Sequence, residues 1–445
     1  NDIGDTIVTI SADNGIGIGN CDLTVTIVGP TSTYNAGGWD VAPSASSKAI
    51  INAPYITSVI GSLDVCSCEM NANLSITSDN YVKIERNLKV NTGAQLLIAH
   101  TGSFVQVNDA ASVTNNGTIN VNVTTPLLKP RDFIISGSPM TAETRDGVHN
   151  ASFRVMDHAT LDFFPDPLVD AFYAPNIVAN FMDDNFNDWS HYTGTINPAE
   201  AYLVSPQASL QDGNSTYNLV FNQGTLNNGI VSYALDFHID KNSSPNMLSN
   251  PYASAIDAEL FINANSEIDE VYFWEHITTP SQSFPGGNTA NFSMEDISMY
   301  NLSGGIGAGT VATNGGMTPN GFIATSQGFG VKATAAGTAT FNNSMRVTTG
   351  NNTLRTTDLL RDRIWLNVVS KTNDLSSETL IAFTDNATEG FDQGYDSEQI
   401  AKFLSLYSHI ENENSLLGIQ AREALSEDKE VSLGFSTLNE EVDTY

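Results

Sequence analysis

Basic side chains are scarce in this chain. Its 445 residues include 18 Lys and Arg against 50 Asp and Glu, which gives a formal net charge of −32. A surface with so much negative charge repels nucleic acid and anionic lipid, so neither is an expected partner. Divalent cations, basic partners and neutral glycans are compatible with it.

Long hydrophobic runs are missing as well. No stretch of about eighteen apolar residues occurs, so the sequence encodes no membrane span. The chain has no basic leader followed by an apolar segment, and it begins at Asn1 rather than at Met. We therefore interpret it as the processed, mature form of an exported protein. Only 15% of the residues are charged, and a polarity carried by Asn, Thr, Ser and Gly indicates an extracellular bacterial surface protein.

Cysteines number only three: Cys21, Cys66 and Cys68. In an extended strand, Cys66 and Cys68 would lie about 7 Å apart on one face, too far for an easy mutual disulfide. We expect Cys21 to pair with Cys66 or with Cys68 in an oxidising compartment. A three-thiolate metal site is the alternative, although no fourth ligand is suggested nearby.

What the chain does contain is a period-two pattern typical of strands. Between Leu63 and Val123, short alternating segments such as ANLSI, YVKI and QLLI are separated by turns such as NTGA and NNGT. Each segment is too short to bury a face alone, so stacked rungs of a β-solenoid explain the pattern best. A meandering sandwich is the alternative. We assign residues 1–125 to this N-terminal domain.

Two further β-domains are predicted, which makes the fold all-β. Residues 126–350 contain longer loops, clustered aromatics and alternating strands such as VYFWEH and GFGVKA, as in a β-sandwich. One helix is expected at SAIDAELFINANS, with Ser254 as N-cap and with Leu260 and Phe261 packing inward. Residues 351–445 open with a linker and continue with strands at RIWLNVVS, ETLIAFT, SLLGIQAR and EVSLGFS, a small β-sandwich.

Motifs for catalysis are not recognisable. The seven histidines are scattered, and neither His-Glu-x-x-His nor Gly-x-Ser-x-Gly occurs. The glycine run Gly304–Gly309 lacks the context of a phosphate-binding loop, so we expect a flexible surface loop there. Aromatic segments around Trp189 and Trp274 could stack on sugar rings, but core packing explains them more simply. We predict no catalytic residue and no required cofactor.

Calcium is the one cofactor that the sequence suggests, at two places. In MDDNFNDW, Asp183, Asn185 and Asn187 alternate like the ligands of a calcium loop, although Asp188 replaces the usual Gly; an Asx-rich turn is the alternative. The acidic stretch Thr384–Gln399 fails as an EF-hand, because Ala387 offers no oxygen. A cation there would need three carboxylates to converge, and a structural turn is again the alternative. These carboxylates belong to Asp385, Asp392 and Asp396.

Several segments resemble large secreted proteins of Bacteroidota. They are NMLSNPYASAIDAELF followed by EVYFWEH, and then DRIWLNVV, LIAFTDNATEGFDQGYD, LYSHIENENSLLGIQAR and EVSLGF. The last four follow the order of the type C sorting signal, the C-terminal domain that directs substrates through the type IX secretion system. The resemblance is most specific over Arg363–Phe435, and Gly390, Asp392, Tyr395 and Asp396 match the connection after the second strand. It implies export, with the secretion machinery as a partner.

These observations favour a secreted, non-enzymatic cell-surface protein with an adhesive or structural role. The alternative is a polysaccharide-acting enzyme or a glycan-binding module. Sorting domains of this type continue for several strands beyond EVSLGFS, so we expect a bare edge and a partly bare apolar face that a donated strand would cover. The donor would be the N-terminal segment TIVTI, and head-to-tail donation would build a filament. Its residues are Thr6, Ile7, Val8, Thr9 and Ile10.

Overall fold

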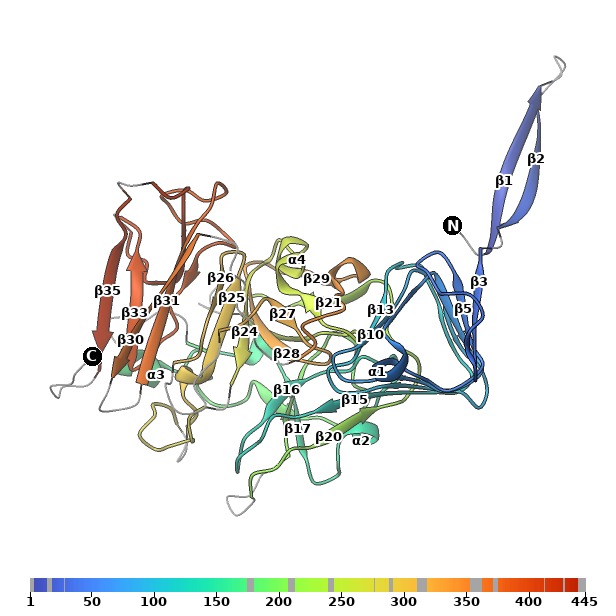
Figure 1. The fold of residues 1–445 in the computed structure, drawn as a ribbon. Helices are drawn as coiled ribbons and strands as arrows, with labels where there is room; N and C mark the ends of the chain where they lie inside the picture. The colour runs from blue at the N-terminus through green and yellow to red at the C-terminus, as the bar shows by residue number, and fades with distance from the viewer. Residues whose placement is uncertain are drawn as a thin grey trace.

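A computed structural model describes most of the chain. It describes residues 29–173, 180–206, 213–238, 244–275, 277–287, 291–309, 318–352, 362–370, 375–411, 413–426 and 429–438, and the backbone of residues 4–13 and 18–27. The fold is mostly β, as predicted (Figure 1). The first two strands, β1 (Gly4–Asp13) and β2 (Ile18–Ile27), form an antiparallel pair with each other.

The N-terminal region is a β-solenoid, so the solenoid prediction is confirmed over the meander. Strands from successive turns stack in parallel on three faces. On one face Leu63, Val82 and Phe104 lie in register, so a turn takes 19 residues (82 − 63) and then 22 (104 − 82). The strands are β3 (Thr31–Asn35), β4 (Gly38–Trp39), β5 (Lys48–Ile51), β6 (Tyr55–Ile56), β7 (Leu63–Val65), β8 (Ser67–Met70), β9 (Leu74–Ile76), β10 (Tyr81–Ile84), β11 (Leu88–Val90), β12 (Gln95–Ile98), β13 (Ser103–Gln106), β14 (Val113–Asn115) and β15 (Thr118–Thr124).

Stacked asparagines reinforce one corner of the solenoid. The amide of Asn52 donates to Asn35 at 3.3 Å, Asn71 donates to Asn52 at 2.8 Å, and Asn91 donates to Asn71 at 2.6 Å. Each asparagine directly follows the last strand residue of its rung, or ends that strand. The repeated turn residue of the sequence therefore serves as a side-chain ladder between rungs.

The central region consists of several sheets packed together. A four-stranded sheet has the order β16-β19-β17-β18, and a five-stranded sheet has the order β22-β28-β24-β25-β26. Strand β20 instead pairs with β15 and so covers the last turn of the solenoid. The strands are β16 (Ile134–Ser136), β17 (Arg154–His158), β18 (Trp189–His191), β19 (Tyr202–Ser205), β20 (Asn218–Phe221), β21 (Val231–Leu235), β22 (Pro245–Ser249), β23 (Ile256–Asp257), β24 (Ile268–Trp274), β25 (Ile297–Asn301), β26 (Gly304–Ile306), β27 (Phe322–Ile323), β28 (Gly328–Ala333) and β29 (Gly337–Phe341).

Helices are short. The predicted helix forms as α4 (Ala258–Asn263), but its N-cap is Asp257, whose carboxylate accepts from the N–H of Leu260, rather than Ser254. Phe261 is buried as expected, whereas Leu260 is 44% exposed because it lies on the outer side of so short a helix. The other helices are α1 (Thr57–Ile60), α2 (Arg145–Val148), α3 (Pro167–Tyr173) and the 3-10 turns η1 (Thr160–Asp162), η2 (Met294–Asp296) and η3 (Asn343–Met345). None of the helices in the described ranges has the length and apolar character needed to cross a bilayer.

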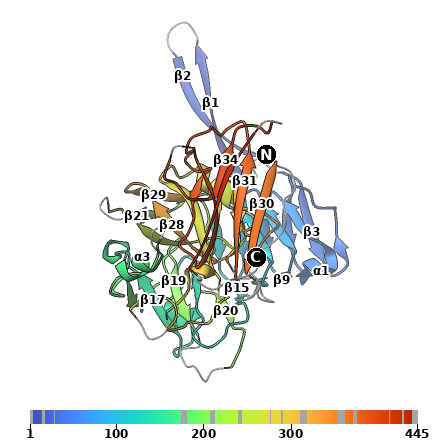
Figure 2. The same ribbon diagram turned by 90° about the vertical axis from the view of Figure 1, so that its left-hand side faces the viewer.

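The C-terminal sheet lies at the opposite end of the molecule from the solenoid (Figure 1), and it faces the viewer in Figure 2. Its order is β30-β31-β34-β33-β35, and it includes the strands predicted from the sequence. Leu380 and Ile419 of this sheet pack in one core with Met299 and Ile306 of the central sheet, so this part of its apolar face is covered within the chain rather than bare. The strands are β30 (Arg363–Ser370), β31 (Leu375–Phe383), β32 (Ser397–Glu398), β33 (Leu404–His409), β34 (Leu417–Arg422) and β35 (Ser432–Thr437).

The glycine run that we expected to be a flexible surface loop is instead buried. It begins with β26, which pairs with β25 at the boundary to the C-terminal sheet. Gly304 has a φ of +135°, and a Cβ there would lie 3.0 Å from the Leu380 side chain. The missing side chains therefore let two sheets approach each other closely.

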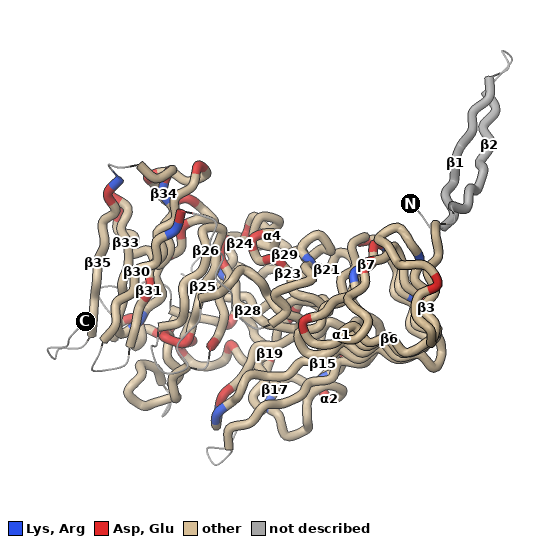
Figure 3. Tube along the Cα trace, viewed as in Figure 1, with Lys and Arg blue, Asp and Glu red and all other residues tan. Residues whose placement is uncertain are grey.

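A buried arginine joins the solenoid to the central region. The Arg346 guanidinium donates to the carbonyl of Phe104 at 2.7 Å and to the side chain of Asn228 at 3.1 Å, and it lies 4.7 Å from the ring centroid of Tyr252. Burial lowers the pKa of Arg346 to about 10. Acidic residues are far more numerous than basic ones, and they occur in every part of the described trace (Figure 3).

Candidate functional site: an aromatic cavity

A cavity of about 320 Å³ lies between the four-stranded and the five-stranded central sheets. Strands β16, β17, β18 and β19 contribute to one wall, and β22, β24 and β28 contribute to the other. Gly330 on β28 presents no side chain to it, and a Cβ there would meet only ordinary contacts at 3.7 Å or more. The principal aromatic lining residues are Phe133, Phe163, Phe181, Phe186, Trp189, Tyr272, Phe273, Trp274, Phe292 and Phe329.

Ring contacts fix much of this lining. Phe133 stacks on Trp274 with ring centroids 4.9 Å apart and planes at 18°. The ring of Phe292 meets both of them edge-on, at 5.1 and 5.7 Å. Phe181 packs against Tyr272 at 4.9 Å in the same manner. Such pairs add about 0.5–1.5 kcal/mol each beyond simple burial, so the aromatic walls are held in place.

The sequence prediction located two tryptophans of this site but not the site itself. Trp189 and Trp274 were expected to pack in the core, and the structure brings both to the same cavity. The edge of the Trp189 ring lies against His158, with centroids 4.8 Å apart. His158 was not singled out, because a lone histidine on a strand carries no recognisable motif.

Few polar groups line the cavity, and two of them, His158 and Asp188, lie beside Trp189. His158 and Trp189 occupy paired positions of the two strands, and Asp188 directly precedes Trp189. Asp188 is only 5% exposed, and one of its carboxylate oxygens lies 3.6 Å from Nε2 of His158. The other polar side chains in the lining are Arg154, Asp183 and Asn291.

The first calcium candidate borders this cavity. The Asp183 carboxylate accepts the backbone N–H groups of Phe164, Asn185 and Asn187 at 2.9–3.3 Å, and Asn185 also accepts from Asn187. These are the hydrogen bonds of an Asx-rich turn, the alternative considered above. Phe186, between the two asparagines, has a φ of +62°, a conformation that bulky residues rarely adopt. Calcium binding by these three residues stays a prediction.

The second candidate lies in the C-terminal sheet. The buried Asp396 carboxylate accepts the N–H groups of Asp392 and Ala421 at 2.6 and 2.7 Å, and burial raises its pKa to about 7. Asp392 in turn accepts from Thr388, while Tyr395 packs against the central core, as the turn interpretation expects. Asp385 takes no part in these bonds. Among the residues described, no three His, Cys, Asp or Glu side chains are placed to hold a metal ion together.

The cysteine and donor-strand predictions fall largely on residues whose side chains lie outside the described part. Cys66 directly precedes β8 and Cys68 lies within it, and both side chains are buried. Burial raises the pKa of Cys68 to about 12. The side chain of Cys21 is not among those described, so the disulfide stays a prediction. Segment 6–10 lies in β1 and pairs with β2 of its own chain, and β1 has no other partner among the strands described.

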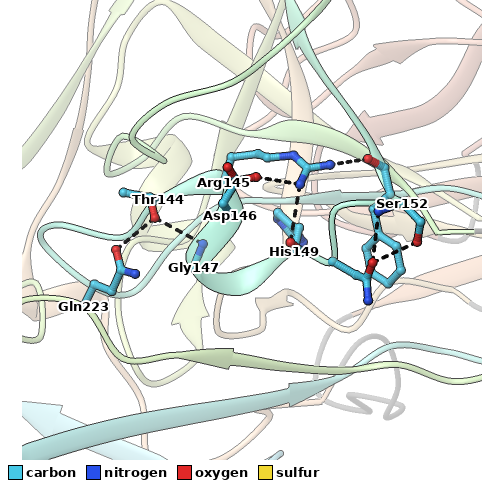
Figure 4. Close-up of polar contacts among 9 residues, drawn as sticks. Thr144, Arg145, Asp146, Gly147, His149, Ser152 and Gln223 are labelled. Atoms are coloured by element: carbon cyan, nitrogen blue, oxygen red, sulfur yellow. Dashed lines mark hydrogen bonds and ion pairs between the residues drawn. The ribbon is translucent and has the colours of Figure 1, made fainter.

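A second polar cluster surrounds α2, and Figure 4 shows it. Thr144 caps the helix by accepting from the N–H of Gly147 at 3.1 Å, and it donates to Gln223 at 2.9 Å. The guanidinium of Arg145 donates to the Phe153 carbonyl. Each of these bonds closes a turn or joins two segments of this chain. We therefore interpret the cluster as structural, and the aromatic cavity remains the candidate site.

Comparison with known proteins supplies a family. A family model described as a domain of unknown function, DUF8693, matches residues 31–444, so the chain belongs to that family. No curated protein and no solved structure matches the chain.

Proposed function

We propose that this member of the DUF8693 family is a secreted cell-surface protein of adhesive or structural type that binds an apolar group of its target in the aromatic cavity. The cavity itself, about 320 Å³ between two sheets with aromatic walls, is the observation that carries the proposal. Ligand sites in proteins are typically concave, mostly apolar and furnished with few polar groups. Export is supported by the resemblance of Arg363–Phe435 to the type C sorting signal and by the scarcity of basic residues.

Glycan binding, alone or as part of a polysaccharide-acting enzyme, is less well supported by the geometry. Sugar rings stack on the open face of an aromatic side chain. One face of Trp274 is covered by Phe133, and Phe292 packs against the same pair edge-on. A compact apolar group suits this lining better than a chain of sugars.

A cavity-filling substitution tests the proposal. The neutral apolar dye Nile red should bind the full chain at one site, with a rise in its fluorescence. Gly330→Leu should abolish that binding, because its side chain enters the cavity from a position where a Cβ causes no clash. Gly37→Leu, in a solenoid turn with no atom within 4 Å of the added Cβ, is the matched control and should bind like the wild type. Equal binding by wild type and Gly330→Leu would refute the cavity as the binding site.

A filament subunit assembled by strand donation is the second candidate, because both edges of the C-terminal sheet carry exposed apolar side chains. Ile364 on β30 is 47% exposed, and Leu433 and Phe435 on β35 are 48% and 44% exposed. Such edges favour the addition of a strand from another molecule. Deletion of residues 1–10 should remove any fibres seen by electron microscopy. Undiminished assembly, or a strictly monomeric wild type, would refute strand donation.

A further inference from the structure

The charged side chains that line the aromatic cavity differ in their hydrogen bonds and in their exposure to solvent. Asp183 is engaged by three backbone N–H groups, and Arg154 is exposed. Asp188 is different: it is almost fully buried, and the 3.6 Å contact with His158 is the only polar contact of its carboxylate within the described part of the chain. That distance is too long for a hydrogen bond.

A buried carboxylate in an apolar wall is costly without a positive partner. The cost of burying an unpaired charge is several kcal/mol in real proteins, and it falls when a cation or strong donors approach. His158 lies nearby but out of hydrogen-bonding range. Asp188 therefore presents to the cavity a carboxylate whose one polar neighbour among the described residues is His158, at 3.6 Å.

We infer that the cavity takes an organic cation with an apolar body, such as a quaternary ammonium group, with Asp188 as its counter-charge. Rings of Phe163, Trp189, Phe181 and Tyr272 would surround the alkyl groups. Aromatic faces attract such cations through the ring quadrupole, and the attraction is stronger where water is excluded. The net charge of −32 further favours the approach of cations over anions.

The size of the cavity agrees with this ligand class. A dry protein cavity of about 150 Å³ already binds benzene, and this one has about 320 Å³. A trimethylammonium head and a short chain therefore fit. The inference names the ligand class of the site in the proposed function and rests on that proposal.

A pair of isosteric ligands separates the cation from its apolar shape. Choline and 3,3-dimethylbutan-1-ol differ in that a quaternary carbon replaces the charged nitrogen. We expect the full chain to bind choline at least about ten-fold more tightly than the neutral alcohol in calorimetry, a difference of about 1.4 kcal/mol. Equal affinity for the two would overturn the inference while leaving the proposed apolar site intact. Failure to bind choline while Nile red still binds would overturn the inference alone, and loss of all three ligands would overturn both.

Substitution of Asp188 gives the second arm. Asp188→Asn should lower choline affinity about ten-fold or more and leave the affinity for the neutral alcohol unchanged. Asp162→Asn, at an exposed acid of the nearby η1 turn, is the matched control and should change neither. An equal loss for both ligands in Asp188→Asn would indicate a structural role and would overturn the inference. If Asp188→Asn fails to fold, the affinities of the wild type for choline and for the neutral alcohol still show whether the cavity prefers the cation.

Discussion

The stability of the junction between the central and C-terminal sheets should depend on one buried carboxyl, that of Glu295. The residue is fully buried on η2, its Oε1 accepts the N–H of Phe403 at 2.7 Å, and its Oε2 has no hydrogen-bond partner among the residues that the structure describes. Burial raises the pKa of Glu295 from 4.5 to about 8, although the charge of buried Lys402 acts in the opposite direction. Below pH 8 the carboxyl is therefore mostly neutral in the folded protein.

The sign of the effect follows from this pKa. Between about pH 4.5 and pH 8 the folded chain holds a proton that the unfolded chain has lost, so the free energy of unfolding falls as pH rises. Each pKa unit is worth about 1.36 kcal/mol, so the rise from 4.5 to about 8 corresponds to a loss of about 5 kcal/mol across that window. Above the folded pKa the loss is complete and the dependence ends.

Glu295→Gln is the perturbation that tests this reasoning. Gln keeps an acceptor for Phe403 and cannot ionise, so the variant should match the wild type near pH 5 and exceed it by a few kcal/mol near pH 8 to 9. Urea denaturation and hydrogen exchange of η2 and β33 across this range would measure the difference. Glu411→Gln, at an exposed position, is the control and should keep the wild-type dependence. A Glu295→Gln variant with the wild-type pH dependence, or one less stable at pH 8, would refute the argument.

Four further predictions concern the rest of the chain. Arg346→Met should cost about 1–3 kcal/mol in urea denaturation, because the Phe104 carbonyl loses its buried donor, whereas the two asparagine oxygens that Arg346 contacts each keep another N–H donor; the exposed Arg131→Met should cost almost nothing. Asn71→Ala, in the middle of the asparagine ladder, should lower solenoid stability by about 1–2 kcal/mol, and an unchanged melting temperature would contradict this. If Asp183, Asn185 and Asn187 bind calcium, a chelator should lower the melting temperature of the central region, and an identical melting curve with excess chelator would count against the site. Peptide mapping without reduction should find Cys21 joined to Cys66 or Cys68, whereas alkylation of all three thiols would rule the disulfide out.

Local signals in the sequence account for the parts of the fold that were predicted correctly. In the solenoid, most strands alternate fully buried with less buried residues, and turns that contain Asn or Gly separate them, so strands and turns could both be predicted from short stretches of sequence. The C-terminal strands were located for the same reason. The cap of α4 shows the limit: Ser254 and Asp257 are both good caps, and burial of Ser254 in the core decides for Asp257.

The covered face of the C-terminal sheet could not be predicted from local signals. Its apolar residues Leu380 and Ile419 lie in strands that were predicted, but Ile306, one of the residues that cover them, lies in the glycine run that we expected to be a loop. From the sequence alone, a glycine-rich segment suggests a flexible loop. In the folded protein the lack of a side chain instead allows two sheets to meet at Gly304.

The cavity escaped prediction because its lining extends from Phe133 to Val331 and comes from both central sheets. Each aromatic segment taken alone has the composition of an ordinary core segment, and only some of these segments are strands. Together they leave space that a protein selected only for stability would fill, since unfilled core volume costs about 24 cal/mol per Å³. Leucine at position 330 would fill part of the space without a clash at its Cβ, yet the chain has glycine there and a buried, weakly paired Asp188 in the same lining. An unfilled volume together with a weakly paired buried carboxylate is the combination expected where a ligand supplies the missing contacts, and this is why the binding proposal rests on the cavity rather than on any exposed surface.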